Sequence, residues 1–437
     1  MRDSMDVLTS APSHASPRWP ARWSLAVAVL AGSWGCVSAQ DYAEPANAIR
    51  VGTTLPFSGE RAASGVALER ALRLAMDVVN EAGALGGRRL ALEVRDSHSA
   101  DDGRGTEATL EMLSDGDLPF FIGPEEPKIA YQIENAIKTY KYKMVNLLPG
   151  LSSPRIHDPS ADAAWFRLSP SPNYLACALA KQMFADGIRK ANAVNDPDDY
   201  SSTFAIIFGR VFSAMGGTVL PGLQLPSSGS SFEDVFATLE RFEPDATLLI
   251  TSPSVGAGFL QEWAVRGKVG QWYLGPTLNN PALLRNVPAG VLEGLPGISP
   301  DLGPNADDFD AYFADATGVP PLAGAHYYFD AVALLALAIA EGLGQTGAIP
   351  EPVTFKLHLQ SVTGSSPQVV SYRNLALGLQ LVAAGQKIQY SGAAGNYVLS
   401  DDGDSIDNRT TIWRIRGNGF EKIGAQQCSD AEVYPGY

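Results

Sequence analysis

The chain has 437 residues, of which 45% are hydrophobic and 18% charged, and its formal net charge is −15. This length exceeds what one hydrophobic core usually serves, so we expect more than one domain. The acidic balance disfavours nucleic acid and anionic lipid surfaces as partners, because both are negatively charged.

The N-terminal segment predicts export from the cytoplasm. Arg18 and Arg22 precede a short apolar run at residues 25–31, and the small residues 37–39 follow it. A basic region, a short apolar run and a cleavage site with small residues are typical of a secretory signal, and the apolar run is too short to span a bilayer. We therefore expect residues 1–39 to be a signal peptide and the protein to be periplasmic or otherwise extracytoplasmic.

The three cysteines leave two questions open. Cys36 follows Gly35, as in a lipoprotein signal, but Ser33 and Trp34 do not fit that pattern, so lipidation of Cys36 and cleavage after residue 39 both remain open. An oxidising compartment would allow Cys177 and Cys428 to form a disulfide. Their separation in sequence gives no geometry, and we favour unpaired thiols.

The first part of the chain alternates strands and helices. The run 49–55 predicts a strand, and the apolar spacing of residues 65–80 predicts a helix that ends at glycines. Further strands are expected at 90–94, 120–122 and 144–147, with helices at 105–114 and 127–140, before residues 166–169 lead out of the series. This alternation predicts a parallel sheet covered on both faces.

A second series of the same kind follows. Its helices are expected at 173–186, 200–215, 232–242 and 258–266, and its strands at 190–194, 217–220, 246–250 and 271–274. The pattern weakens near residues 290–300. Helices are then expected at 307–317, 325–343, 354–359 and 369–384, and strands at 395–399 and 411–415. The apolar segment 331–340 is expected to be a core helix, because it is too short to span a bilayer.

Several segments, in order, resemble one family. They are Ile49-Arg-Val-Gly with Leu55-Pro-Phe-Ser-Gly59, Leu74-Ala-Met-Asp-Val-Val-Asn80, Phe121-Ile-Gly-Pro124, Tyr327-Tyr-Phe-Asp330-Ala and Ile388-Gln-Tyr390-Ser-Gly392. Together they resemble the type I periplasmic solute-binding proteins of ABC transporters, within the branched-chain amino acid and amide receptor group. The resemblance runs from about residue 49 to residue 423.

The resemblance implies an α/β fold with two Rossmann-like lobes that are joined by three hinge crossings and close on a ligand. Lobe 1 is expected to comprise residues 48–168 and 298–390, lobe 2 residues 169–297 and 391–425, and a C-terminal tail residues 426–437. The strand pattern agrees independently, since ligands of open α/β sheets bind at the carboxyl ends of the strands. A ligand held between two such edges would select the closed state.

The expected ligand contacts of lobe 1 follow its strands. Phe57 and Ser58 come after the first strand, where Phe57 could pack on a ligand and Ser58 could donate to it, although a simple turn would look the same. Leu151 and Ser152 belong to a later loop, and the resemblance places Ser152 at a hydroxyl position that touches the ligand.

The loop Gly123-Pro-Glu125-Glu126-Pro127 departs from the family. In amino acid receptors of this family, Ser and Thr at this position help to hold the ligand carboxylate. Glu125 and Glu126 would instead exclude an anionic group and favour a cation or a polar neutral group. The alternative is a pair of surface carboxylates that complement the dipole of the next helix, and the pattern gives this alternative more weight.

In lobe 2, the resemblance implies that Tyr200 covers the ligand, although an aromatic residue at a helix start is more often core packing. Ser252 and Ser254 follow one strand and Thr277 follows another, so all three are expected to face the cleft. Amino acid receptors often carry an acidic partner for the ligand ammonium at the position of Thr277. The departure at Thr277, with the Glu pair, puts an ordinary α-amino acid ligand in doubt.

The remaining motifs point away from catalysis. The five histidines show no metal spacing, and no nucleophile motif, phosphate loop or dinucleotide fingerprint occurs. We therefore expect a protein without cofactor or metal that is not an enzyme. The resemblance implies a monomeric binding protein that delivers a small polar metabolite (an amino acid, an amide or a related compound) to ABC permease subunits in the membrane. A ligand sensor for a signalling receptor, with no transport role, is the alternative, and a hydrolase is a third that lacks a visible nucleophile and base.

Overall fold

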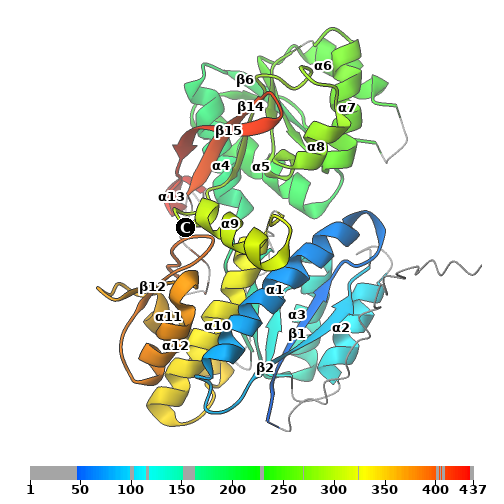
Figure 1. Ribbon diagram of the computed structural model, residues 1–437. Helices are drawn as coiled ribbons and strands as arrows, with labels where there is room; N and C mark the ends of the chain where they lie inside the picture. Colours follow the sequence, from blue (N-terminus) through cyan, green and yellow to red (C-terminus); the bar gives the residue numbers. More distant parts are fainter. Residues whose placement is uncertain are drawn as a thin grey trace, which may run out of the picture. The chain divides into compact units, whose positions relative to one another are not determined.

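In the computed structural model, the described residues are 47–98, 103–114, 118–150, 163–226, 231–268, 270–322, 324–399, 403, 405 and 409–433. They form two α/β lobes, each built on its own sheet (Figure 1). The two-lobed α/β architecture expected from the sequence is therefore confirmed.

Sheet A, in lobe 1, consists of five parallel strands in the order β2-β1-β3-β4-β5. They are β1 (Ile49–Leu55), β2 (Leu90–Asp96), β3 (Phe120–Ile122), β4 (Met144–Leu148) and β5 (Ala163–Arg167). A one-turn helix, η1 (Gly59–Arg61), follows β1, and the helices of this lobe are α1 (Ala62–Ala82), α2 (Arg104–Ser114), α3 (Pro127–Tyr140), α9 (Ala306–Thr317), α10 (Ala325–Thr346), α11 (Pro352–Thr363) and α12 (Leu375–Ala383).

Alternate side chains of β3 enter different cores, as the pleat of a strand requires. Phe120 and Ile122 belong to a large cluster with residues of α1, α10, α11 and α12. Phe121 belongs instead to a cluster with residues of α2 and α3. Helices therefore cover both faces of sheet A, which leaves the carboxyl ends of its strands to carry the polar loops.

Sheet B, in lobe 2, has the order β15-β14-β11-β10-β9-β6-β7, and β8 also pairs with β6. Its strands are β6 (Lys190–Asn195), β7 (Thr218–Val219), β8 (Leu223–Gln224), β9 (Ala246–Ile250), β10 (Trp272–Leu274), β11 (Pro296–Pro300), β14 (Thr410–Arg416) and β15 (Gly419–Gln426). The strands β14 and β15 run antiparallel to their neighbours. The helices of this lobe are α4 (Pro172–Ala185), α5 (Asp199–Ala214), α6 (Glu233–Phe242), α7 (Pro253–Val265), α8 (Pro281–Asn286) and α13 (Asp430–Val433).

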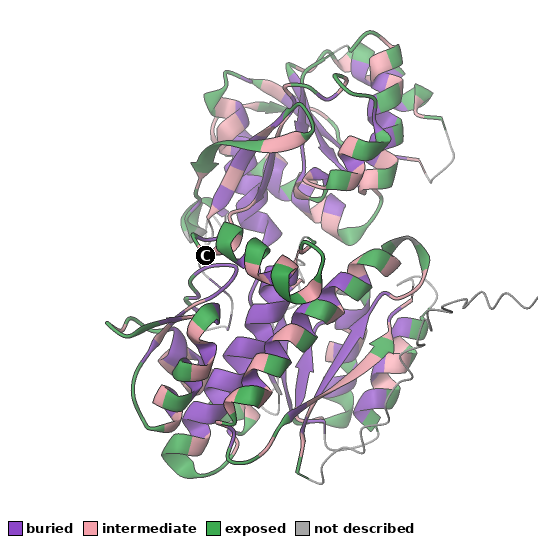
Figure 2. Cartoon of the chain, viewed as in Figure 1, coloured by how far each residue is buried: buried purple, intermediate pink, exposed green. Residues whose placement is uncertain are grey.

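The helix α10 is the core of lobe 1. Among the described residues it is the one helix long and apolar enough to cross a membrane, but 89% of its most apolar 18-residue window is buried inside the lobe. Figure 2 shows it buried along most of its length. The expectation of a core helix at residues 331–340 is therefore confirmed.

Three chain segments connect the two lobes, and backbone hydrogen bonds link these segments to one another. The amide of Arg167, at the end of β5, donates to the carbonyl of Gly403 (3.1 Å), and the amide of Ser405 donates back to the carbonyl of Arg167 (2.8 Å). The amide of Gly303, after β11, donates to the carbonyl of Ala394 (2.9 Å). The three crossings therefore form one connected hinge. The expected lobe boundary at 297/298 falls inside β11, a strand of sheet B, and not in the crossing segment that follows it.

Two local predictions were wrong. Residues 369–384 are not one helix, because the segment begins as the strand β12 (Val369–Ser371), which pairs in parallel with β13 (Gln389–Ser391), and only then turns into α12. Residues 395–399 are not a strand, since they make isolated bridges instead of a ladder. The weak pattern near residues 290–300 hides β11, a short strand in the middle of sheet B.

The preference for unpaired thiols was also wrong. Cys177 and Cys428 form a disulfide with a Cα–Cα distance of 6.3 Å. Cys177 lies on α4, and Cys428 follows β15, so tertiary packing brings together two residues that are 251 positions apart. Sequence separation alone could not reveal this contact.

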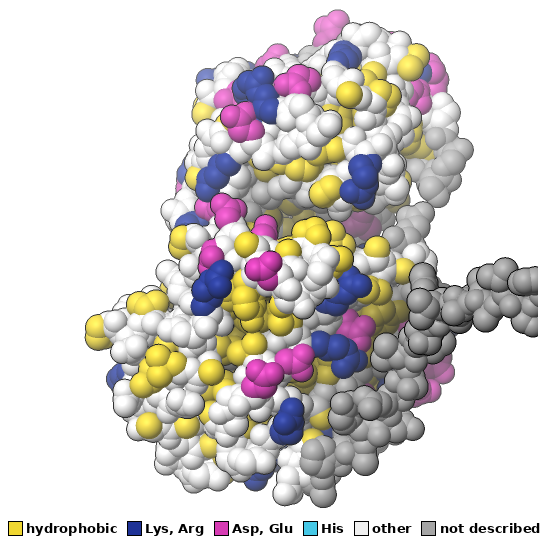
Figure 3. All heavy atoms as spheres, in the orientation of Figure 1, with side chains coloured by type: hydrophobic (Ala, Val, Ile, Leu, Met, Phe, Trp, Pro, Cys, Tyr) yellow, Lys and Arg dark blue, Asp and Glu magenta, His cyan; other side chains and the backbone are white. Residues whose placement is uncertain are grey.

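On the face shown in Figure 3, basic and acidic side chains alternate over the surface rather than gathering by sign. That distribution differs from the continuous basic stripe by which proteins bind nucleic acid.

Candidate functional site

The polar loops of lobe 1 follow three adjacent strands of sheet A. Because β2, β1 and β3 are parallel neighbours, their carboxyl ends lie at one edge of the sheet. The loop after β1 carries Phe57 and Ser58, the segment after β2 carries His98, and the loop after β3 carries Glu125 and Glu126. The structure therefore brings four of the expected site residues to the same edge.

Ser58, His98 and Asp96 are in direct contact. The Ser58 hydroxyl lies 3.0 Å from Nδ1 of His98, and an Asp96 carboxylate oxygen lies 3.1 Å from the same nitrogen. The other Asp96 oxygen accepts from the amides of Phe57 and His98, each at 2.8 Å. Burial pushes the pKa of Asp96 up, but the hydrogen bonds from His98, Phe57 and Ser58 outweigh it and leave the pKa below its ordinary value.

This contact does not have the geometry of a nucleophilic triad. A triad needs the carboxylate on one imidazole nitrogen and the serine hydroxyl on the other, so that the ring can take the proton of the hydroxyl. In this protein both groups meet Nδ1 of His98. The arrangement fixes the loops after β1 and β2 and presents a hydroxyl and an imidazole at the edge of the sheet.

Arg61 forms ion pairs with both glutamates of the third loop. Its Nη2 lies 2.5 Å from Oε1 of Glu125, and its Nη1 lies 2.7 Å from Oε1 of Glu126. Burial raises the pKa of Glu126, and Arg61 only partly offsets that effect. Glu126 is also the N-cap residue of α3, but its side chain makes no capping hydrogen bond. With a side-chain exposure of 7% it is not a surface carboxylate, so the surface alternative is wrong for Glu126.

The Tyr328 phenol lies beside this cluster. The side chain is fully buried, and among the described residues its hydroxyl has no hydrogen-bond partner. Burial raises the pKa of this phenol, and the negative charges of the two glutamates raise it further. A Cβ on Gly150 would lie 3.5 Å from this hydroxyl and 3.4 Å from Cγ of Glu125, so the end of β4 also reaches the cluster.

The polar residues of lobe 2 also follow adjacent strands. Asp196, after β6, accepts from the Thr251 hydroxyl (2.7 Å) and from the Ser252 amide (3.0 Å), both after β9. Thr277, after β10, donates its hydroxyl to the carbonyl of Thr251 (2.7 Å). Burial raises the pKa of Asp196, and its two hydrogen bonds lower it only in part. A connected polar network therefore spans three strand ends of sheet B.

The other three expected residues of lobe 2 also have structural partners. The Ser252 hydroxyl accepts from the amide of Val255 (3.4 Å) and so caps α7, which begins at Pro253 and not near residue 258. The Ser254 hydroxyl lies 3.2 Å from that of Ser252. Tyr200 is half-buried and packs against the core of lobe 2, with its ring 6.2 Å from that of Phe204.

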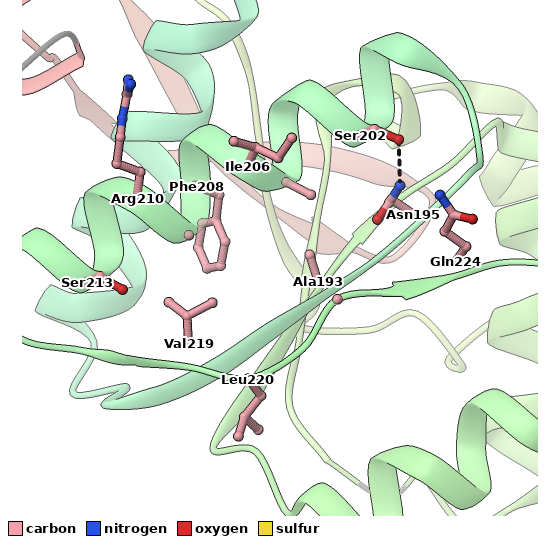
Figure 4. Close-up of a pocket in the computed structure, with 13 residues that line it drawn as sticks. Ala193, Asn195, Ser202, Ile206, Phe208, Arg210, Ser213, Val219, Leu220 and Gln224 are labelled. Carbon is pink, nitrogen blue, oxygen red and sulfur yellow. Dashed lines mark hydrogen bonds between the residues drawn. The ribbon is translucent and has the colours of Figure 1, made fainter.

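A separate cavity of about 510 Å³ lies in lobe 2, between α5 and the edge strands β7 and β8 (Figure 4). Its lining is mostly apolar, with Ile206, Phe208 and Val219, and Asn195 and Ser202 meet at one end through a hydrogen bond of 3.4 Å. None of the expected ligand residues lines it. The cavity is therefore distinct from the polar strand ends.

Sequence reasoning missed several residues of these clusters, among them Arg61, His98 and Asp196. Asp196 directly follows an expected strand and was within reach of the same argument that selected Ser252. Arg61 and His98 gave no such signal, because their roles depend on contacts across 65 and 40 positions of sequence. Leu151 and Ser152 lie outside the described residues, as do residues 1–39 with Cys36.

Within the described part of the chain, no three His, Cys, Asp or Glu side chains are grouped as a metal site would need. The two clusters contain hydroxyls, carboxylates, one guanidinium and one imidazole. Such a set suits the binding of a small polar molecule through hydrogen bonds and charge.

A sequence profile described as "Periplasmic binding protein" matches residues 48–398. The chain is 22% identical over 363 residues to the chemotactic signal transduction system substrate-binding protein BasB of Halobacterium salinarum, a match that covers 80% of this chain and 83% of BasB. These matches extend across both lobes.

Solved structures match both lobes as well. A leucine binding protein from Thermotoga maritima has a TM-score of 0.69 at 16% identity, covering 87% of this chain and 99% of that one. A solute binding protein of an ABC transporter from R. palustris, in complex with benzoate, has a TM-score of 0.66 at 19% identity, covering 88% and 98%. The branched-chain amino acid transporter protein LivJ of Streptococcus pneumoniae, in complex with isoleucine, has a TM-score of 0.67 at 15% identity, covering 87% and 99%. At these identities the likeness establishes the fold alone.

Proposed function

The chain belongs to the periplasmic binding protein family and has its type I fold, and from this premise we propose that it is the extracytoplasmic solute-binding component of an ABC importer. It binds a small polar metabolite, such as an amino acid, an amide or a related compound, by closing its lobes. One observation carries the proposal. Each sheet gathers a connected set of polar side chains at the carboxyl ends of adjacent strands, where open α/β sheets bind ligands.

Lobe closure gives the ligand contacts from both sets at once. On lobe 1 the contacts come from Phe57, Ser58, Glu125, Glu126 and the loop with Leu151 and Ser152. On lobe 2 they come from Tyr200, Ser252, Ser254 and Thr277. The hinge of three hydrogen-bonded crossings supports this picture, because it lets two rigid lobes rotate about a few backbone positions.

The disulfide supports the proposed location. Disulfides persist in oxidising compartments and are rare in the cytosol. The bond between Cys177 and Cys428 therefore favours export, as the basic and apolar segments of residues 1–39 do. We propose a monomer that docks on permease subunits and is either free or tethered through Cys36.

A sensing role is the second candidate, and one relative favours it. BasB is a chemotactic signal transduction substrate-binding protein. A sensor would keep the same ligand site and would present the closed state to a signalling receptor instead of a permease. Uptake of the ligand that is lost on deletion of the protein would favour transport, whereas unchanged uptake with lost taxis would favour sensing.

A catalytic role has less support. The family is one of solute-binding proteins, and both Ser58 and Asp96 contact the same nitrogen of His98. We propose that the protein releases its ligand unchanged. Turnover of amides or esters by the purified protein would contradict this.

Calorimetry of two variants tests the site assignment. A thermal-shift screen first identifies a solute that stabilises the protein, and titration then gives its affinity. Tyr200→Ala and Ser152→Ala should each weaken binding about tenfold, as expected for the loss of one good contact, while the protein still unfolds cooperatively.

Tyr140→Ala is the matched control, because Tyr140 is 66% exposed on α3 and lies away from the strand ends. It should leave the affinity unchanged. Unchanged affinity in both Tyr200→Ala and Ser152→Ala would reject the proposed site.

A further inference from the structure

The cavity of lobe 2 runs along one face of α5 (Figure 4). Five of its lining residues recur on that face at helical spacing, at Ser202, Ala205, Ile206, Gly209 and Ser213. The stretch of helix from Ser202 to Ser213 is about 16 Å long. The opposite wall comes from the edge of sheet B, where β6, β7 and β8 lie. The space of about 510 Å³ is therefore elongated and suits an extended molecule.

The cavity is open because the edge of sheet B is interrupted. β6 pairs with β7 near its start and with β8 at its end, and on this side it has no ladder partner in between. Pro221, which lacks a backbone N–H, lies in the break between β7 and β8. Ala193 of β6 and Ala205 of α5 line the cavity from its two walls. Such small side chains leave a space that larger ones would fill.

Two large apolar side chains of the lining are exposed. Ile206 of α5 is 67% exposed, and Val219 of β7 is 38% exposed. Figure 4 shows them on opposite walls of the cavity. Apolar side chains that stay exposed in a concave site favour the binding of an apolar molecule, because both surfaces then leave water. The middle of the cavity therefore suits an apolar chain.

One end of the cavity is polar. The side-chain nitrogen of Asn195 donates to the carbonyl of Asp196 (2.7 Å) and to the Ser202 hydroxyl (3.4 Å). Among the described residues, the carboxamide oxygen of Asn195 has no hydrogen-bond partner, and the Ser202 hydroxyl has no acceptor for its own hydrogen. The exposed carboxamide of Gln224 lies beside them and adds a donor and an acceptor (Figure 4). A head group that both donates and accepts hydrogen bonds matches this end.

The lining offers no charge to a ligand. Among the described residues that line the cavity, Arg210 is the one charged side chain. Its guanidinium donates to the carbonyl of Val433, and Figure 4 shows it pointing away from the cavity. A charged head group would leave water here without meeting an opposite charge, which is unfavourable. The chemistry of the lining therefore selects a neutral ligand.

We propose that this cavity is a second binding site, for a neutral amphipathic molecule with an extended apolar body and a head group such as a primary amide or an alcohol. The site goes beyond the proposed solute-binding function, because none of the residues expected to hold the transported solute lines it. Its described walls all belong to lobe 2, so binding here needs no lobe closure.

Probes that share one chain and differ in the head group test the ligand class. Octanamide, 1-octanol, octanoate and octylamine are titrated into the purified protein, and binding is followed by ligand-observed NMR, which detects weak complexes. The amide and the alcohol should bind at least tenfold more tightly than the two charged probes. Acetamide, which lacks the apolar body, should not bind. Charged probes or acetamide that bind as tightly as octanamide would overturn the proposal, as would a failure of both neutral probes to bind.

Variants then test where the probe binds. Val219→Trp places a larger side chain in the cavity from the edge strand and should weaken octanamide binding at least tenfold. Ser202→Ala removes a hydroxyl from the polar end without adding bulk and should weaken octanamide binding about fivefold. Thermal unfolding of both variants should stay cooperative. Octanamide that binds both variants as it binds the unchanged protein would place the probe elsewhere, the interlobe cleft included, and would overturn the proposal.

Val265→Trp is the matched control, because Val265 lies in the same lobe, is 88% exposed on α7 and does not line the cavity. It should bind octanamide as the unchanged protein does, and an equal loss of binding in Val265→Trp and Val219→Trp would contradict the site. Analytical ultracentrifugation tests the other occupant, a second copy of the chain. A dimer of the unchanged protein that Val219→Trp dissociates would show that a second copy covers Ile206 and Val219, and would also overturn the proposal.

Discussion

Asp330 is a fully buried carboxylate that accepts four hydrogen bonds. One oxygen accepts from the Tyr390 hydroxyl (2.7 Å) and the Ala393 amide (2.8 Å), and the other accepts from the Ala394 amide and the Tyr397 hydroxyl (both 2.8 Å). Asp330 lies on α10, and its four donors lie in or beside one hinge crossing. A single side chain thus ties the hinge to the core of lobe 1.

Asp330→Asn should destabilise the protein more than its small change in size suggests. Each carboxylate oxygen accepts a hydrogen bond from a backbone N–H. In asparagine the side-chain NH2 group replaces one of these oxygens, so one backbone N–H would face another donor and lose its acceptor. A buried donor left without an acceptor costs about 1–3 kcal/mol, so we expect a fall of this size in the free energy of unfolding, measured by denaturant titration. Asp315→Asn, on an exposed position of α9, is the control. Equal stability of the two variants would contradict this role of Asp330.

At the residue scale, the sequence predicted which loops carry the polar residues of the site, but not which side chains pair with them. Glu125 and Glu126 could be selected because they follow a strand and precede a helix with Pro at its start. Their ion pairs with Arg61 could not, since Arg61 lies more than sixty positions earlier and has no motif of its own. The charge that the site presents depends on this pairing, which no local pattern of the sequence reveals.

Among the elements, α4 and the C-terminal segment of lobe 2 are joined twice. The disulfide links Cys177 of α4 to Cys428, and Lys181 of α4 donates to the Gln427 carbonyl (2.9 Å) and pairs with Glu432 (2.7 Å). These contacts anchor the strand β15, which lies at one edge of sheet B. The disulfide therefore restrains the end of the chain against the lobe.

Removing the disulfide should weaken lobe 2. Cys177→Ala combined with Cys428→Ala should lower the free energy of unfolding by about 2–5 kcal/mol, because the open chain gains conformational freedom when it unfolds. Calorimetric unfolding with and without a reductant checks this. The reductant should destabilise the unchanged protein and leave the double variant unaffected. A reductant that affects neither protein would show that the bond does not stabilise the lobe.

Regular elements were predictable where local pattern and tertiary structure agree. The helix expected at 127–140 and the strand expected at 246–250 have the observed bounds, because the spacing of their apolar residues matches the core that they enter. The segment 369–384 was expected to be one helix because Leu375, Leu379 and Val382 have helical spacing. These residues do belong to a helix, but it begins only after β12. The strand itself exists through pairing with β13, which no local pattern reveals.

At the scale of the whole molecule, the crossings are close-packed through glycine. A Cβ on Gly303 would lie 2.5 Å from Cα of Gly395, so two crossing segments touch backbone to backbone. A Cβ on Gly392 would lie 2.3 Å from an oxygen of Asp330. The hinge therefore has no room for a side chain at these two positions.

The two-lobed plan was predictable because strands and helices alternate in two long series, each of which needs its own sheet. Which crossing joins which lobe was less predictable. β11 is short and begins and ends with proline, and β14 and β15 return to sheet B from the far end of the chain. Such long-range pairings depend on the folded chain and not on any local pattern.

Small-angle X-ray scattering tests the central claim, which is that two hinged lobes close on a small solute. The radius of gyration of the purified protein is measured alone and with a saturating amount of a solute that calorimetry has shown to bind. We expect the radius to fall on binding, as rotation about the crossings brings the polar strand ends of both sheets onto the ligand. An unchanged radius at saturation would contradict the account.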